Sequence, residues 1–252
     1  MNDPGADWLV PDWPAPACVR AVCTTRSGGV SMGCYESLNL GDHVGDVPAE
    51  VASNRVRLRH AIGARPVFLQ QVHGTRVLTL DAAAEDGGEA DACTTIESGI
   101  ACTIMVADCL PVLFTDATGT RVAAAHAGWR GLAAGVLERS LDSFPVSHRA
   151  GLIAWLGPCI GPDAFEVGGD VRTVFESGAP EAAHCFKPAN VAAKWFADLP
   201  GLARHRLRAA GVTQICGNDS SDVWCTVHNP LRFFSHRRDR SSGRFAACIW
   251  RT

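Results

Sequence analysis

The sequence has no excess of basic residues and no long hydrophobic run. Its 23 Lys and Arg residues against 26 Asp and Glu give a formal charge of −3, which argues against a nucleic-acid binder, because such proteins usually carry a basic face. No window reaches the roughly 20 apolar residues that a membrane helix needs. Residues 1–16 also lack the basic start and apolar core of a secretory signal. We therefore expect a cytoplasmic protein with neither a membrane nor a nucleic-acid partner.

Cysteine is plentiful, but its usual structural patterns are missing. The eleven cysteines include no C-x-x-C pair, which argues against a structural zinc knuckle. An odd number of cysteines without an export signal does not describe a disulfide framework. We expect most of them to be reduced and packed in the core. A functional cysteine must therefore be identified by its neighbours.

Internal repeats, linkers and the G-x-G-x-x-G motif are absent as well. Apolar runs predict strands at 18–23, 67–70, 77–80, 101–106, 112–115, 122–125, 152–156, 212–215 and 245–250. Helical patterns predict helices at 48–62, 131–144, 169–177 and 191–210, the last broken or kinked near Pro200. Strands and helices mix without a strict βαβ rhythm. This predicts one α+β domain over residues 1–252, with mixed β-sheets flanked by helices, and not a Rossmann fold.

Three short blocks place reactive residues among small ones at the ends of predicted strands. They are residues 70–74 with His73, 107–111 with Asp108 and Cys109, and 124–131 with His126. Two imidazoles and a thiolate suit zinc, and three protein ligands leave a fourth position open. By spacing alone the signal is weak, because a buried core cysteine is the default for Cys109. The glycines beside the histidines and Pro111 after the cysteine favour a metal site.

The third block also leads into a predicted helix. Its backbone N–H groups and Arg130 could receive an anion at the helix start. An ordinary helix entry with a solvated Arg130 explains the same residues equally well.

At these blocks the chain resembles the laccase-domain family, also called multicopper polyphenol oxidases, which are now understood as purine nucleoside phosphorylases. The likeness spans nearly the whole chain and rests on matching blocks at 24–31, 37–46, 54–55, 71–74, 90–92, 107–111, 126–131, 157–161, 165–168, 233–239 and 242–244. Two departures are mild: His236 stands where many members have tyrosine, and Ser242 where threonine is common. Either could alter the rim of the substrate site.

The resemblance implies a zinc site made by His73, Cys109 and His126. It implies phosphorolysis of adenosine, inosine, guanosine and methylthioadenosine, with deamination of adenosine as a second activity. It also implies a fold similar to the cysteine-hydrolase domain of a bacterial toxin. Purine nucleosides and phosphate are thus the expected partners, and the chain is expected to act as a monomer or a homodimer.

Several residues are candidates for roles around that metal. Arginine suits phosphate binding through its planar charged fork; Asn39 is a candidate for ribose or base, Asp108 for moving protons or orienting a ligand, and Trp129 for stacking on a purine. The phosphate candidates are Arg26, Arg55 and Arg130, each of which could instead form a surface or loop-capping salt bridge. We expect Arg237, Arg238 and Asp239 to form a structural ion network.

Three other functions compete with this one. A copper-dependent polyphenol oxidase is the first, but a four-copper laccase needs about ten histidine ligands, largely in H-x-H pairs, whereas this chain has nine histidines and no such pair. Copper could still bind at the zinc site, because it outcompetes zinc for nitrogen and sulfur ligands. The second is a metal-free cysteine hydrolase with Cys109 as nucleophile and His126 as base. The third is a non-catalytic interaction module.

Overall fold

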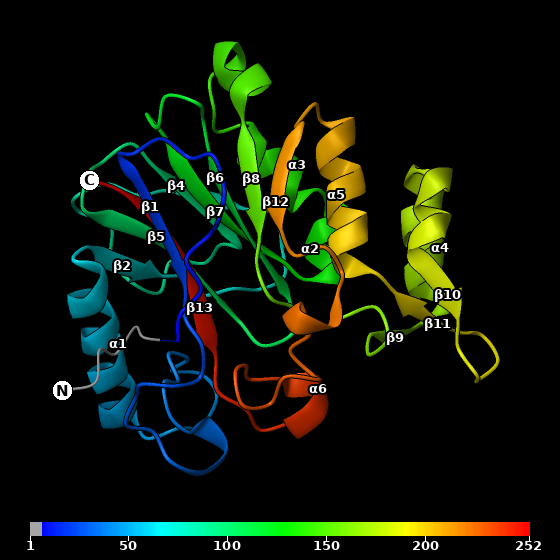
Figure 1. The fold of residues 1–252 in the computed structure, drawn as a ribbon, viewed down its shortest axis with the longest axis horizontal. Helices are drawn as coiled ribbons and strands as arrows, with labels where there is room; N and C mark the ends of the chain where they lie inside the picture. The colour runs from blue at the N-terminus through cyan, green and yellow to red at the C-terminus, as the bar shows by residue number, and fades with distance from the viewer. Residues whose placement is uncertain (1–6) are drawn as a thin grey trace.

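Two mixed β-sheets form the centre of the computed structural model, which describes residues 7–252 (Figure 1). The four-stranded sheet has the order β1 (Val19–Cys23), β13 (Phe245–Arg251), β5 (Ile100–Val106), β2 (Arg65–Phe68). The six-stranded sheet has the order β12 (Gln214–Gly217), β8 (Ile153–Leu156), β6 (Leu110–Thr115), β7 (Val122–Ala127), β4 (Ala92–Thr95), β3 (Val77–Thr79). Both sheets combine parallel and antiparallel pairs.

Alternate residues of each strand face opposite sides of its sheet. The residues on the two facing sides pack together and form one hydrophobic core between the sheets. In β5, Cys102 and Ile104 point into the layer between the sheets, where they join Leu113 of β6. Met105 points the other way, into a separate cluster with Leu58. Every residue of β5 is buried on one side or the other, which explains why this strand appears in the sequence as an unbroken apolar run.

Helices cover the outer faces of both sheets (Figure 1). Helix α1 (Pro48–Ile62) packs on the four-stranded sheet. Helices α2 (Trp129–Ala134), α3 (Val136–Leu141) and α5 (Leu199–Ala209) contribute to the core on the other side of the six-stranded sheet. Beyond them lies a small antiparallel sheet, ordered β10 (Phe186–Pro188), β11 (Lys194–Ala197), β9 (Glu166–Gly168), with helix α4 (Gly169–Gly178). A short helix, α6 (His236–Asp239), precedes β13, and 3-10 turns occupy Gly33–Tyr35, Val146–Gly151, Pro180–Cys185 and Asp222–Trp224.

This arrangement confirms the predicted α+β class with mixed sheets and flanking helices. The helix predicted at 48–62 has those bounds. Two other helix predictions were wrong. The segment 131–144 is broken into α2 and α3 by Gly135, which has a left-handed φ of 100°. The segment 191–210 contains strand β11 and helix α5, and Pro200 lies in the first turn of α5, where a missing N–H costs nothing.

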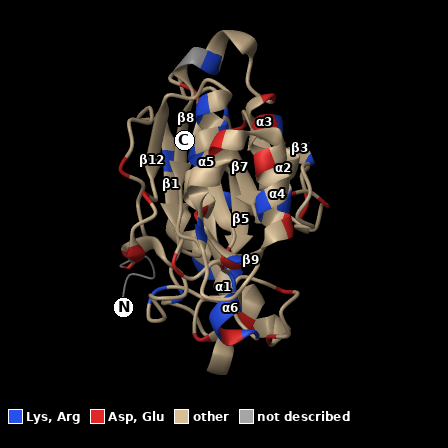
Figure 2. Ribbon diagram, turned by 90° about the vertical axis from the view of Figure 1, so that its right-hand side faces the viewer, with Lys and Arg blue, Asp and Glu red and all other residues tan. Residues whose placement is uncertain are grey.

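Charged residues of both signs share the helical face of the molecule. In Figure 2, basic and acidic positions occur together on α3 and α4, whereas α6 at the end of the molecule is mostly basic. Within residues 7–252, no helix combines the length and the apolar character that crossing a bilayer requires.

Candidate active site

Three chain segments from different strands bring His73, Cys109 and His126 together. His73 lies in the loop between β2 and β3, Cys109 at the corner between β5 and β6, and His126 within β7. One possible ligand atom from each of the three lies within 4.8 Å of the other two. The structure therefore assembles the triad that the three sequence blocks predict.

The spacing of the triad suits a tetrahedral metal ion. Cys109 Sγ lies 3.7 Å from His73 Nε2. Ordinary zinc–sulfur and zinc–nitrogen bonds at a tetrahedral angle would separate the two atoms by about 3.6 Å. The rings of His73 and His126 meet edge to face, with centroids 4.7 Å apart. The donor set and its geometry thus fit zinc, and three protein ligands leave room for a fourth group.

The thiol and the imidazole of the triad shift each other's pKa. Burial alone would raise the pKa of Cys109, but the charge and hydrogen bond of His126, helped by His73, lower it to about 6. Burial would lower the pKa of His126, but Cys109 and Asp91 raise it to about 9. Near neutral pH the cysteine is therefore ready to act as a thiolate, the form that binds metal or attacks as a nucleophile.

Gly128 allows the triad to close. A Cβ at this position would lie 2.7 Å from Cδ2 of His73 and 3.0 Å from Sγ of Cys109, closer than non-bonded atoms approach. The backbone of Gly128 is extended, with φ −65° and ψ 156°, so the residue is required for its lack of a side chain and not for an unusual φ. This gives a steric reason for the glycine near His126.

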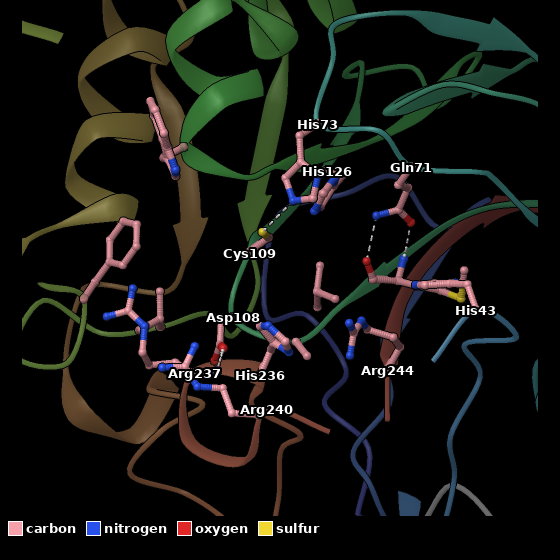
Figure 3. A pocket seen from close by; sticks show the side chains of 16 residues that line it. His43, Gln71, His73, Asp108, Cys109, His126, His236, Arg237, Arg240 and Arg244 are labelled. Carbon is pink, nitrogen blue, oxygen red and sulfur yellow. Dashed lines mark hydrogen bonds between the residues drawn. The ribbon is translucent and has the colours of Figure 1, made fainter. Parts of the chain in front are cut away.

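The triad faces a cavity of about 510 Å³ (Figure 3), which is within the usual range for small-molecule sites. Trp129, Ile160 and Phe165 give it apolar walls. Arg237, Arg240 and Arg244 line it as well, together with His43 and His236. The cavity therefore combines a metal-ligating triad, aromatic surface and several cationic groups.

Asp108 connects the triad to the arginine side of the cavity. It has a left-handed φ of 91°, and its two carboxylate oxygens accept hydrogen bonds from Thr226 Oγ1 and from the backbone N–H of Arg237, each at 2.6 Å. Both oxygens are thus engaged. These contacts fit the orienting role that the sequence left open for Asp108. Asp108 also lines the cavity, and its oxygens keep free lone pairs, so the proton-moving role stays a prediction.

The four residues predicted to bind substrate do not line this cavity. Asn39 is fully buried, and its amide bonds Gly41, Asp46 and the backbone of Arg244. Its predicted contact with ribose or base is therefore wrong, because the side chain is used to fix its own loop. Arg26 donates to the carbonyls of Glu36 and Pro230, so it caps loops through hydrogen bonds and not through the salt bridge that was the alternative.

The other two predicted arginines lie near the cavity but outside it. Arg55 donates to the Leu40 carbonyl, pairs with Asp42 and stacks on Phe68. Arg130 is exposed, with its guanidinium 4.4 Å from the ring centre of Trp129. Of the ion network expected further along the chain, Arg238 binds Asp239 and backbone carbonyls. The guanidinium of Arg237 binds no carboxylate within residues 7–252; it donates to the carbonyls of Ala164 and Glu166, and Arg237 also lines the cavity.

Two polar residues that hold the site together were missed from the sequence. Gln71 forms a two-way amide contact with the backbone of Met105, donating to its carbonyl and accepting from its N–H. Asp91 is fully buried and accepts from His126 Nδ1 at 2.8 Å. Burial would raise the pKa of Asp91, but the hydrogen bonds from His126 and Gly74 lower it. The sequence did contain a signal for Asp91, because an acidic residue is unusual within a stretch of small apolar residues such as 90–93.

Comparison with known proteins places these features in a family. A family model described as multi-copper polyphenol oxidoreductase laccase matches residues 20–252. A protein of Pseudomonas aeruginosa named purine nucleoside phosphorylase is 53% identical over 243 residues, covering 96% of this chain and 98% of that protein. The Escherichia coli protein named purine nucleoside phosphorylase YfiH is 48% identical over 244 residues, with 96% and 98% covered.

Solved structures agree with the sequence relatives. The crystal structure of a Neisseria meningitidis protein has a TM-score of 0.92 and 46% identity, covering 97% of this chain and 99% of that one. YlmD of Geobacillus stearothermophilus has a TM-score of 0.88 and 32% identity, covering 97% and 96%. With the family model spanning both sheets and all three triad residues, the chain belongs to the multi-copper polyphenol oxidoreductase laccase family.

Proposed function

We propose that the protein is a zinc-dependent purine nucleoside phosphorylase that also deaminates adenosine. The close relatives that carry the name purine nucleoside phosphorylase support the first part. The observation that carries the proposal is one cavity in which the His73–Cys109–His126 triad stands with aromatic and cationic groups. Phosphorolysis of a nucleoside needs these three elements: a polarising group, a surface for a flat base and charges for phosphate.

The apolar and cationic lining residues suggest where each reactant binds. Trp129 and Phe165 offer faces for a purine. Arg237, Arg240 and Arg244 are the proposed phosphate partners, because guanidinium groups bind phosphate oxygens through paired hydrogen bonds. This assignment replaces Arg26 and Arg55, which do not line the cavity. Arg130 does not line the cavity, and its guanidinium stacks on the ring of Trp129.

In the proposed reaction a phosphate oxygen bonds to the anomeric carbon while the bond from that carbon to the purine nitrogen breaks. The electron pair of the broken bond leaves with the purine, which then takes up a proton. A zinc ion at His73, Cys109 and His126 would supply Lewis acidity and lower the pKa of water to about 7, as deamination requires. In this proposal the arginines position the phosphate, and Asp108 fixes both the Cys109 corner and the backbone of Arg237.

One alternative keeps a specific observation in its favour. The lowered pKa of Cys109 and the raised pKa of His126 are also those of a cysteine hydrolase with a thiolate–imidazolium pair. A four-copper oxidase has less support. Among residues 7–252, only two groups of three or more His, Cys, Asp or Glu are close enough to hold a metal, and each contains at most two histidines.

The test combines product analysis with metal removal. Purified protein is incubated with adenosine with and without phosphate, and adenine, ribose 1-phosphate, inosine and hypoxanthine are followed. We expect adenine formation to depend on phosphate and inosine formation not to. Neither product should form in His73→Ala or in the chelated wild type, and added zinc should restore both products in the chelated wild type. His60→Ala, an exposed histidine on α1, is the control and should keep full activity.

The outcomes separate the candidate functions. Equal product formation by His73→Ala would refute the proposed site. Activity that survives chelation but is abolished by Cys109→Ser would indicate the metal-free hydrolase. The proposed location is the cytoplasm, consistent with all eleven cysteines being free thiols, because reducing conditions there keep thiols unpaired.

A further inference from the structure

Asp91 stands behind the triad, at a point where it reaches two of the three ligands. It lies one residue before β4, and its backbone carbonyl accepts from the N–H of His126 on the neighbouring strand β7. Its side chain is fully buried and does not line the cavity. A buried carboxylate destabilises the fold unless its oxygens accept hydrogen bonds. The hydrogen bonds of Asp91 therefore indicate its role.

The first contact fixes the ring of His126. Asp91 Oδ1 lies 2.8 Å from His126 Nδ1. Because a carboxylate oxygen can only accept, Nδ1 carries a hydrogen, and in the neutral ring that binds a metal the lone pair is left on Nε2. The carboxylate thus selects both the orientation of the ring and the nitrogen that is available to a metal.

The second contact fixes the backbone that carries His73. Three successive N–H groups, from Val72, His73 and Gly74, donate to the same carboxylate at 3.2, 2.8 and 2.6 Å. His73 has a left-handed φ of 61°, which is unfavourable for a residue with a side chain. The carboxylate of Asp91 holds the loop in that conformation, and it is this conformation that directs His73 Nε2 toward Cys109.

We propose that Asp91 is the positioning residue of the metal site and that it sets the geometry of His73 and His126 with one carboxylate. The inference rests on the metal site of the proposed function, but not on the reaction carried out there. Mutation of a residue that hydrogen-bonds to a metal ligand usually lowers metal affinity about 10–100-fold. Asp91 reaches two ligands at once, so we expect its loss to fall at the upper end of that range.

Asp91→Asn is the direct test, because it keeps the shape and replaces one oxygen by an NH₂ group. If that group occupies the place of Oδ2, it opposes the N–H groups of Val72 and Gly74. If it occupies the place of Oδ1, it opposes His73 N–H and drives the hydrogen of His126 from Nδ1 to Nε2, where it blocks the metal. Either orientation should lower zinc affinity about 10–100-fold, measured by competition with a chromophoric chelator.

The matched control is Asp116→Asn. Asp116 is also buried and accepts from several groups, on Thr118, Thr120 and His148, but none of these belongs to the triad. We expect this variant to bind zinc like the wild type even if it is less stable. Cys109→Ser shows separately whether the triad is the metal site, and its failure to weaken binding would refute the proposed function and not only the role of Asp91.

Two readouts distinguish positioning from simple support of the fold. At saturating cobalt, the ligand-field absorption of Asp91→Asn should differ from that of the wild type, because the ligands are placed differently even when the site is full. In the wild type loaded with zinc, nitrogen NMR should find His126 with hydrogen on Nδ1 and metal on Nε2; this needs no variant. Wild-type affinity and spectrum in Asp91→Asn, or metal on Nδ1 of His126, would overturn the proposal.

Discussion

Replacing Gly128 by alanine should empty the metal site without unfolding the protein. The added Cβ would lie 2.7 Å from His73 Cδ2 and 3.0 Å from Cys109 Sγ, whereas non-bonded carbon atoms prefer separations of about 3.5–4.0 Å. One of the two ligands must therefore move by about 1 Å. Metal–ligand distances tolerate deviations of only about 0.2 Å. We expect zinc affinity to fall by about 100-fold or more, at least as much as the loss of an outer partner causes.

The backbone gives little reason for the variant to misfold. Gly128 precedes α2 with φ −65° and ψ 156°, which alanine adopts readily. The change from glycine to alanine before a helix costs about 1 kcal/mol. The assay is zinc affinity by chelator competition beside thermal unfolding of the metal-free protein. Gly178→Ala is the control, because a Cβ there meets nothing within 4 Å; it should leave zinc affinity unchanged and should not destabilise the protein, since alanine is favoured over glycine in a helix.

A Gly128→Ala protein that binds zinc as tightly as the wild type would refute the reasoning. It would mean that His73 and Cys109 approach the metal from other positions. A protein that fails to fold would instead point to a packing role for Gly128. The unfolding curve of the metal-free variant separates these two results.

Two further predictions concern stability. Burial opposes ionisation of Asp116, but hydrogen bonds from Thr120, Thr118 and His148 lower its pKa from 3.8 to about 2. Ionised Asp116 therefore stabilises the folded state above pH 4 by about 2 kcal/mol, and this contribution is lost as the pH falls from about 4 to about 2. Acid titration of Asp116→Asn should lack this loss of stability. A stability profile equal to that of the wild type would contradict the assignment. Gly135→Ala places a side chain at φ 100° between α2 and α3, which should cost about 1–2 kcal/mol in chemical denaturation; no loss would show that the two helices do not need this left-handed turn.

The sequence predicted the elements whose pattern is local. Helix α1 has the predicted bounds because its start at Pro48 and its end before Gly63 are both signalled by the chain itself. The break at Gly135 was missed because a glycine inside a helical pattern is often tolerated. Strand β11 was missed because it is short and forms only by pairing with β9 and β10.

The candidate site divides in the same way. The triad was predicted because each ligand lies in a short block at the end of an apolar run. The cationic side of the cavity was not, because the positions of Arg240 and Arg244 depend on how the segment before β13 returns to β5. Asn39 and Arg26 gave no sign in the sequence that their polar groups would be used by their own loops.

The three triad residues come from both large sheets. His73 follows β2 of the four-stranded sheet, His126 belongs to β7 of the six-stranded sheet, and Cys109 sits on the corner that joins β5 of one to β6 of the other. A shared ion would link the two sheets, and it could bind all three ligands only after the sheets have packed together. A chain whose sheets have not packed would then be inactive. Metal at 100 times its dissociation constant would add about 2.7 kcal/mol to the free energy of unfolding, and therefore to the packing of the two sheets.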